Sequence, residues 1–179
     1  MKKQARIDEK APRSQTMLVG AAGEHHVMAE LLRRNYIAAL APRGAPNADI
    51  VVSDFKGLRL CSIQVKTRRD KGSDGGWHMK DKHEGITGEQ LFYCFVDFGK
   101  DVTARPTVHV IPSEKVATVV KQSHQAWLAA PGKKGQPHKD TVMRRLLPDH
   151  ERHFGKINNP YPAGWLEQYR DAWHLLRLD

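Results

Sequence analysis

The sequence predicts a mixed α/β domain in which a β-sheet is flanked by helices. A helical pattern of apolar residues precedes a group of short apolar runs, and a second helical pattern follows them. The runs between the helices have the length of strands and are separated by segments rich in Gly, Pro and Asn. The chain has 179 residues, 40% of them hydrophobic, which is enough for a buried core.

The first helix is predicted over residues 14–35, after a polar, basic arm at residues 1–13. Offsets of three and four place one group of its residues on a single face, namely Ala21, Glu24, Val27, Met28 and Leu31. After a loop rich in Pro and Gly at 41–47, two strands are expected at 48–53 and 58–67. The sequence Asp-Phe-Lys-Gly between these strands predicts a hairpin turn.

Residues 68–90 are rich in Gly and charge and are expected to be mostly loop. Two further strands are predicted at 91–98 and 107–111. A second helix should then run from Ser113, a plausible N-cap, to about Ala130.

A basic linker at 131–140 is expected to lead to a last helix at 163–178. The apolar stripe of that helix is formed by Leu166, Tyr169, Trp173 and Leu176. These elements divide the chain into an arm (1–13), an α/β domain (14–130) and a basic linker with a helical extension (131–179).

Composition favours an acidic partner. The formal net charge is +9, and the excess is concentrated in residues 1–16, 66–82 and 133–156. These three stretches also have the least apolar periodicity, so they are expected to be an arm and two loops. Contact with the phosphates of a nucleic acid explains three such basic stretches better than ordinary solvated surface does. The two cysteines lie in hydrophobic stretches, so neither a disulfide scaffold nor a cysteine-based zinc site is expected.

No apolar run has the length of a membrane span, and the N-terminal stretch has no apolar segment typical of a secretory signal. We therefore expect a soluble, cytoplasmic protein that does not contact a membrane.

Four polar residues in unusual positions indicate chemistry. Glu24 lies on the apolar face of the first helix, although an exposed position at the edge of that helix is an alternative. Asp49 begins a strand, where aspartate is rare unless it forms a turn or binds a ligand. Alternation places Gln64 and Lys66 on one face of the next strand. Hairpin pairing should bring Asp49, Gln64 and Lys66 to one end of the sheet.

Two acids, an amide oxygen and a lysine suit the hydrolysis of a phosphodiester. Oxygen ligands bind hard cations such as Mg²⁺, and the cation polarises a phosphate and acidifies a water molecule. Lys66 could orient or deprotonate that water, or neutralise charge on the phosphate.

The helix that opens on Gly20-Ala21-Ala22-Gly23-Glu24, the strand Asp49-Ile50-Val51-Val52 and the strand Ile63-Gln64-Val65-Lys66-Thr67 resemble the PD-(D/E)XK nuclease superfamily. This resemblance spans roughly residues 17–115. It implies the restriction endonuclease-like fold, a central four-stranded mixed sheet in an αβββαβ order. Among its members, the sequence is most similar to archaeal Holliday junction resolvases and to a group I intron homing endonuclease.

In the family pattern Glu24 matches the helix acid, Asp49 the motif aspartate, Gln64 the D/E position and Lys66 the motif lysine. The resemblance thus implies a Mg²⁺- or Mn²⁺-dependent endodeoxyribonuclease, in which the Val65 carbonyl completes the metal shell. Two residues depart from the pattern: Ala48 replaces the usual proline, and neutral Gln64 replaces an acid. Because Gln64 is neutral, a DNA-binding module that has lost catalysis remains an alternative function. An RNA-directed nuclease is a further alternative.

Duplex or branched DNA is the expected partner, and a homodimer is expected because cutting both strands usually needs two sites. The backbone of the nucleic acid should be held by the loop 68–82 and by the stretch 133–145. The residues expected to contact it are Arg43, Arg68, Arg69, Lys71, Trp77, Lys80, Lys82, Lys133 and Lys134.

Other motifs have simpler explanations. His150 and His153 have helical spacing but lack the partners of a zinc site, so a solvated polar face is expected. Trp127, Trp165 and Trp173 have helical spacing and are assigned to the core. A Walker phosphate loop and a serine nucleophile elbow are both absent from the sequence.

Overall fold

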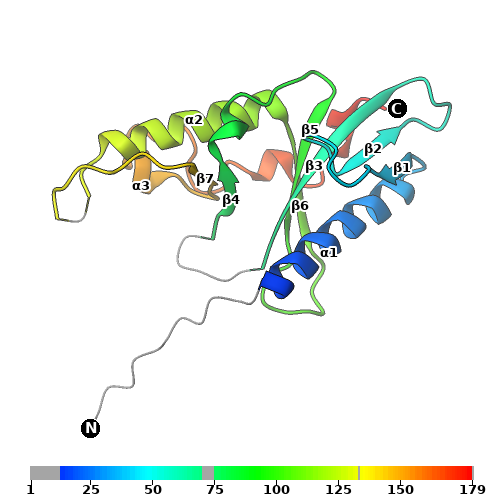
Figure 1. Ribbon diagram of the computed structural model, residues 1–179, viewed down its shortest axis with the longest axis horizontal. Helices are drawn as coiled ribbons and strands as arrows, with labels where there is room; N and C mark the ends of the chain where they lie inside the picture. Colours follow the sequence, from blue (N-terminus) through cyan, green and yellow to red (C-terminus); the bar gives the residue numbers. More distant parts are fainter. Residues whose placement is uncertain (1–12, 70–74, 133, 179) are drawn as a thin grey trace, which may run out of the picture.

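The computed structural model describes residues 13–69, 75–132 and 134–178 and contains a mixed five-stranded sheet with a helix on each side (Figure 1). The main sheet has the strand order β1-β2-β3-β5-β6. Only the β3–β5 pair is parallel, and the other neighbours are antiparallel. Its helices and strands are α1 (Arg13–Leu32), β1 (Ile37–Leu40), β2 (Ile50–Ser53), β3 (Leu60–Arg68), β5 (Leu91–Asp97), β6 (Thr107–Pro112) and α2 (Ser113–Ala129).

Strand alternation builds a separate core on each face of this sheet. On β5, Phe92, Cys94 and Val96 pack toward α1, whereas Tyr93 and Phe95 pack on the opposite face with apolar residues of α2. Both cysteines are buried and free. The mixed sheet flanked by helices is thus confirmed, and the predicted strands and the first two helices agree with it to within a few residues at their ends.

A second, two-stranded sheet joins parts of the chain that lie far apart in sequence. Strand β4 (Trp77–Lys80) pairs antiparallel with β7 (Met143–Leu146), and the 3-10 turn η1 (Asp81–Glu84) follows β4. The described part of the connection between the parallel strands β3 and β5 therefore contains β4 and η1, where the αβββαβ order implies an α-helix. Strand β1 is the fifth strand, which the sequence pattern missed because its four residues are mostly exposed at the sheet edge.

The last segment is not the α-helix that the apolar stripe predicts. It contains the short helix α3 (Glu151–Phe154) and two 3-10 turns, η2 (Glu167–Tyr169) and η3 (Trp173–Leu176). This segment crosses the free edge of β6, where the Asp171 amide donates to the Val108 carbonyl over 2.9 Å. Its stripe is divided between the two cores because Leu166 packs on the α2 side and Trp173 on the α1 side.

Two local predictions are also corrected. Pro112 is the N-cap of α2, and the Ser113 side chain makes no capping bond. The Ser113 hydroxyl instead accepts from the Gly88 amide and donates to the Gly88 carbonyl. His150 is fully buried among aromatic rings such as Tyr161 and Trp165, so it does not belong to a solvated face.

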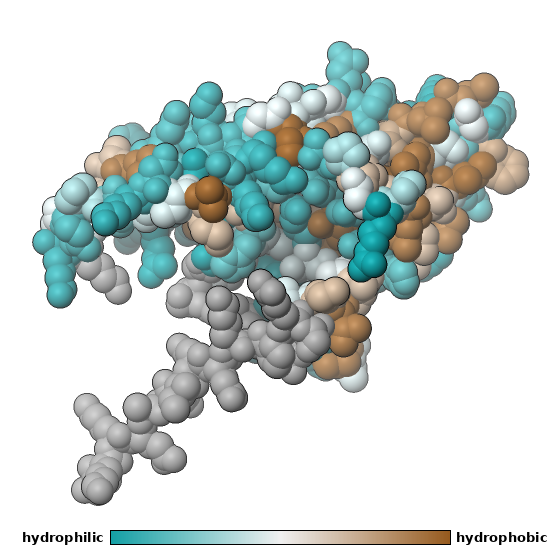
Figure 2. Space-filling model, viewed as in Figure 1, coloured by the Kyte–Doolittle hydropathy of each residue, from teal (hydrophilic) through white to brown (hydrophobic). Residues whose placement is uncertain are grey.

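Apolar side chains are also distributed unevenly on the surface. Exposed apolar residues gather over the end formed by β1, β2 and the hairpin tip, whereas the end formed by α2 and the loop after it is hydrophilic (Figure 2). Among the described residues, no helix has both the length and the apolar character needed to cross a membrane.

Candidate active site

Three neighbouring strands bring polar side chains into one row across the sheet. The β2–β3 register pairs Ile50 with Ile63, so Asp49, one residue before β2, lies opposite Gln64. The β3–β5 register then pairs Gln64 with Tyr93. The Asp49 carboxylate is held in place because its Oδ2 atom accepts from the Val65 amide over 2.7 Å. The predicted convergence of Asp49 with β3 is thus present.

Helix α1 brings Glu24 to the same region. Gly23, its neighbour, faces the side chain of Thr67 so closely that a Cβ atom there would overlap it. This contact seats the helix on the end of β3. Burial raises the pKa of Glu24, and the negative charge of Asp49 raises it further, whereas His25 and Lys66 lower it. Glu24 therefore lies within electrostatic range of two other predicted site residues.

Lys66 lies two residues beyond Gln64 on the same face of β3. Burial is the main cause that lowers the pKa of its ammonium group. Asp49 and Glu24 oppose that shift, and the charges of Lys82 and Lys80 add to it. Lys66 thus lies within electrostatic range of two acids and two lysines.

Gln64 carries an unsatisfied group. Its side chain is 8% exposed, and its Oε1 atom is buried without a hydrogen-bond partner in the described structure. A buried carbonyl oxygen without a partner is costly, and a hard cation is one partner that would satisfy it. The part of the chain that the structure describes has no cluster of three or more His, Cys, Asp or Glu residues suited to a metal. A cation here would therefore depend on two carboxylates and amide or backbone oxygens, a donor set that fits Mg²⁺ or Mn²⁺.

A buried histidine–tyrosine pair adjoins this row and was missed by the sequence reasoning. The Nδ1 atom of His83, in η1, lies 2.9 Å from the Tyr93 hydroxyl. Burial, followed by the charge of Lys66, lowers the pKa of His83 to about 4. His83 is therefore neutral at pH 7. The only sequence signal was a tyrosine within an apolar strand, because His83 reaches the site through the fold of η1.

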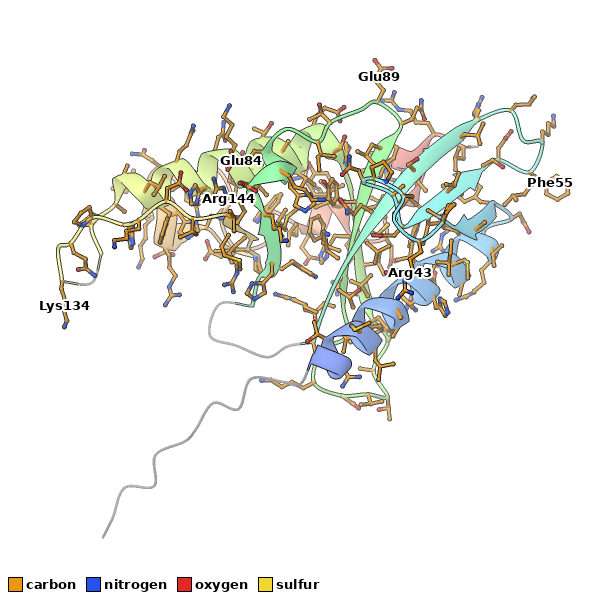
Figure 3. The ribbon with its side chains drawn as sticks, viewed as in Figure 1. Arg43, Phe55, Glu84, Glu89, Lys134 and Arg144 are labelled. Atoms are coloured by element: carbon orange, nitrogen blue, oxygen red, sulfur yellow. The ribbon has the colours of Figure 1, made fainter. Side chains whose placement is uncertain are left out.

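Several residues expected to contact nucleic acid are available at the surface. Lys80 and Lys82 are exposed and lie near Lys66, since both act on its pKa. Arg43 is exposed in the loop before β2, and Arg69 is exposed just after β3. Lys134 is also exposed, but it lies at the opposite end of the molecule from β1 and β2 (Figure 3). Lys71 and Lys133 lie outside the described residues.

The expectation for Trp77 requires a correction, and Arg68 is engaged within the fold. Trp77 is 1% exposed, and its indole nitrogen donates to the Val96 carbonyl over 3.0 Å, so it cannot stack on bases as expected. Arg68 is ion-paired with Asp97 at 2.5 Å, and its guanidinium lies 3.9 Å from the centre of the Trp77 ring. The pairing of β4 with β7 buries Trp77, and Arg68 then packs over it.

The fold of this chain, but not its sequence, has matches among known proteins. Neither the protein-family models nor the curated protein sequences match this chain. The bacterial homing endonuclease I-Ssp6803I is similar over 90% of this chain and 90% of its own, with 15% sequence identity and a TM-score of 0.51. Hjc, a Holliday junction resolvase from Archaeoglobus fulgidus, matches 72% of this chain and 83% of its own, with 14% identity and a TM-score of 0.38. The first likeness confirms the predicted restriction endonuclease-like fold.

Proposed function

We propose that this protein is a metal-dependent endodeoxyribonuclease that hydrolyses phosphodiester bonds. The observation that carries the proposal is the buried Oε1 atom of Gln64, which has no partner among the described residues and lies in one row with Asp49. Glu24 and Lys66 are within electrostatic range of the same point. The fold shared with a bacterial homing endonuclease supports DNA as the substrate.

Each residue has a distinct role in this proposal. Glu24, Asp49, Gln64 and the Val65 carbonyl would hold Mg²⁺ or Mn²⁺, which when bound polarises the scissile phosphate and acidifies a water molecule. The Val65 amide orients Asp49 and leaves its second carboxylate oxygen for the ligand. Lys66, with its lowered pKa, either takes a proton from the attacking water or donates to the phosphate.

Exposed cations around this point would bind the phosphate backbone. Lys80, Lys82, Arg43 and Arg69 are the described residues suited to that role. A homodimer would supply the second site needed to cut both strands of a duplex.

The neutral Gln64 favours a second candidate, a DNA-binding module of the same fold that has lost catalysis. An amide oxygen carries no net charge, so it binds a cation more weakly than a carboxylate does. This candidate predicts binding of DNA without cleavage in either metal.

Nicking of supercoiled plasmid and of branched DNA in Mg²⁺ or Mn²⁺ tests the proposal. We expect cleavage by the wild type and a loss of about 100-fold or more in Asp49→Asn, which removes a charged metal ligand, and in Lys66→Ala, where it is the scale of a lost acid–base group. Asp101→Asn and Lys121→Ala, which change exposed residues elsewhere, are the matched controls. A wild type that binds DNA but cuts it with neither metal would establish the second candidate. Preferential cutting of competing RNA would exclude the DNA specificity.

A further inference from the structure

A cavity of about 720 Å³ lies apart from the candidate active site, between the last turns of α2, the loop after it, β7 and α3. This volume is within the range of small-molecule sites. None of the residues of the Asp49–Gln64–Tyr93 row lines it. The elements that line the cavity lie at the end of the molecule where α2 ends (Figure 1), and the surface of that end is largely hydrophilic (Figure 2).

One wall of the cavity is aromatic. The Trp127 ring stacks with His138 at a centroid distance of 4.0 Å and an interplanar angle of 24°. It also stacks with His124 at 5.4 Å and 28°. Trp127 is only partly buried, although its spacing had assigned it to the core. A set of near-parallel rings at the edge of a cavity is a platform on which a planar ring can stack.

A second part of the lining is basic and is fixed by ion pairs. Arg144 is largely buried and is held by the Glu84 carboxylate, by Asp140 and by the Thr141 carbonyl. The charge of Arg144 is therefore compensated, and its role is to fix the wall. Arg152, by contrast, is exposed at the rim, on α3. A guanidinium there is suited to a phosphate because its planar donors match phosphate oxygens.

The turn η1 connects this cavity to the candidate active site. His83 faces the site and contacts the Tyr93 hydroxyl. Glu84, the next residue, faces away and pairs with Arg144 in the cavity wall (Figure 3). Consecutive residues of this short turn thus contact the Asp49–Gln64–Tyr93 row and the cavity wall.

We propose that this cavity binds one unpaired nucleotide of a nucleic acid, with its base against the stacked ring set built on Trp127 and its phosphate at Arg152. A base within an intact duplex is stacked on both faces and offers neither to a side chain, whereas an unpaired base exposes its face. The cavity would therefore favour single-stranded, branched or frayed DNA over a blunt duplex. This inference rests on the proposed nuclease function for the identity of the nucleic acid, but it concerns binding and not cleavage.

Fluorescence anisotropy in EDTA tests the inference on the full chain, because cleavage is then suppressed. The probes are a labelled single-stranded oligodeoxynucleotide and a blunt duplex of the same sequence. We expect Trp127→Leu and Arg152→Ala each to weaken single-strand binding about tenfold, a magnitude typical of one stacked base or one charged contact, and to change duplex binding less than twofold. Trp127→Phe should retain most of the single-strand affinity, and Arg105→Ala, an exposed arginine outside the cavity, should retain all of it.

Single-strand affinities unchanged in both Trp127→Leu and Arg152→Ala would overturn the inference. An equal loss for the duplex would also overturn it, because a general effect on charge or folding would then explain the result. The outcomes are separable from those of the nuclease proposal. A protein that cuts DNA but binds single strands independently of Trp127 and Arg152 contradicts only the cavity, whereas one that never cuts but shows the tenfold losses contradicts only the nuclease.

Discussion

Gln64 is the single residue on which the proposed chemistry depends most. It occupies the place that an acid takes in the resembled nuclease pattern, and its buried oxygen has no partner among the described residues. Two carboxylates already repel one another nearby, since Asp49 raises the pKa of Glu24. A third carboxylate would increase that repulsion when no cation is bound, and it would strengthen the binding of a cation.

Gln64→Glu is therefore expected to lower the Mg²⁺ concentration needed for half-maximal nicking, by about tenfold, because charged ligands raise the affinity for hard cations. A Mg²⁺ titration of the nicking rate measures this shift. Gln64→Leu, which removes the oxygen but keeps the volume, should raise the requirement. If both variants show the wild-type Mg²⁺ dependence, Gln64 is not a metal ligand.

At the scale of elements, the position of α1 decides where Glu24 lies. Gly23 allows the helix to approach Thr67 of β3, and the two residues are in contact without room for a Cβ atom. Gly20, one turn earlier in the same helix, has no atom within 4 Å of the position of its Cβ. Alanine substitution at each of these two glycines therefore distinguishes the effect of close packing from that of helix propensity.

We expect Gly23→Ala to lower the free energy of unfolding by about 1–3 kcal/mol through overpacking. Gly20→Ala should raise it by up to about 1 kcal/mol, because alanine favours the helix and meets no obstacle. Urea denaturation followed by circular dichroism measures both. Equal stabilisation by the two substitutions would contradict the close seating of α1 on β3.

The segment after β7 behaves as an integral part of the fold. It crosses the edge of β6 and contributes buried side chains to both cores, Leu166 on one face and Trp173 and Leu176 on the other. An appended tail would contribute to neither core.

Leu176→Ala is accordingly expected to cost about 2–5 kcal/mol of stability, because Leu176 is 1% exposed. Ile157→Ala is the control in the same segment, where the side chain is 96% exposed, and should change stability by less than about 0.5 kcal/mol. Thermal or urea unfolding distinguishes them. A neutral Leu176→Ala would mean that η3 is not packed on the α1 side of the sheet.

At the scale of the whole molecule, buried histidines couple stability to pH. Burial lowers the pKa of His83 to about 4 and that of His150 to about 3, with His153 adding to the latter shift. In the unfolded chain both titrate near the ordinary value of about 6.5. As the pH falls below that value, the unfolded chain binds protons that the folded chain excludes, so stability declines until the folded values are reached.

Between pH 7.5 and pH 5 we expect the free energy of unfolding to fall by about 2 kcal/mol for each of these two histidines. Urea unfolding at the two pH values measures the loss. His150→Leu should reduce the loss by about 2 kcal/mol, whereas His174→Ala, which changes an exposed histidine, should leave it unchanged. A stability that does not vary over this range would show that the two rings are not buried in their neutral form.

Much of the candidate site could be predicted from the sequence because its parts are local. Strand alternation and a short hairpin are enough to bring Asp49 opposite Gln64, and Lys66 follows at a spacing of two. Helical spacing put Glu24 in line with the apolar face of the first helix, although it left an exposed position at the helix edge open. By contrast, His83 and Tyr93 meet only through η1, and no local pattern predicts that turn.

The sequence by itself determined the order of the first two helices and of four strands of the main sheet, and the residues of the proposed site, because apolar periodicity and turn residues act over a few positions. Tertiary structure alone decided the burial of Trp77 and His150, the course of the last segment and the cavity beside Trp127. Each of these depends on segments far apart in the chain, such as β4 with β7. The same local pattern permits several placements of a side chain or segment, and long-range packing selects one of them. Only the folded chain therefore reveals that placement.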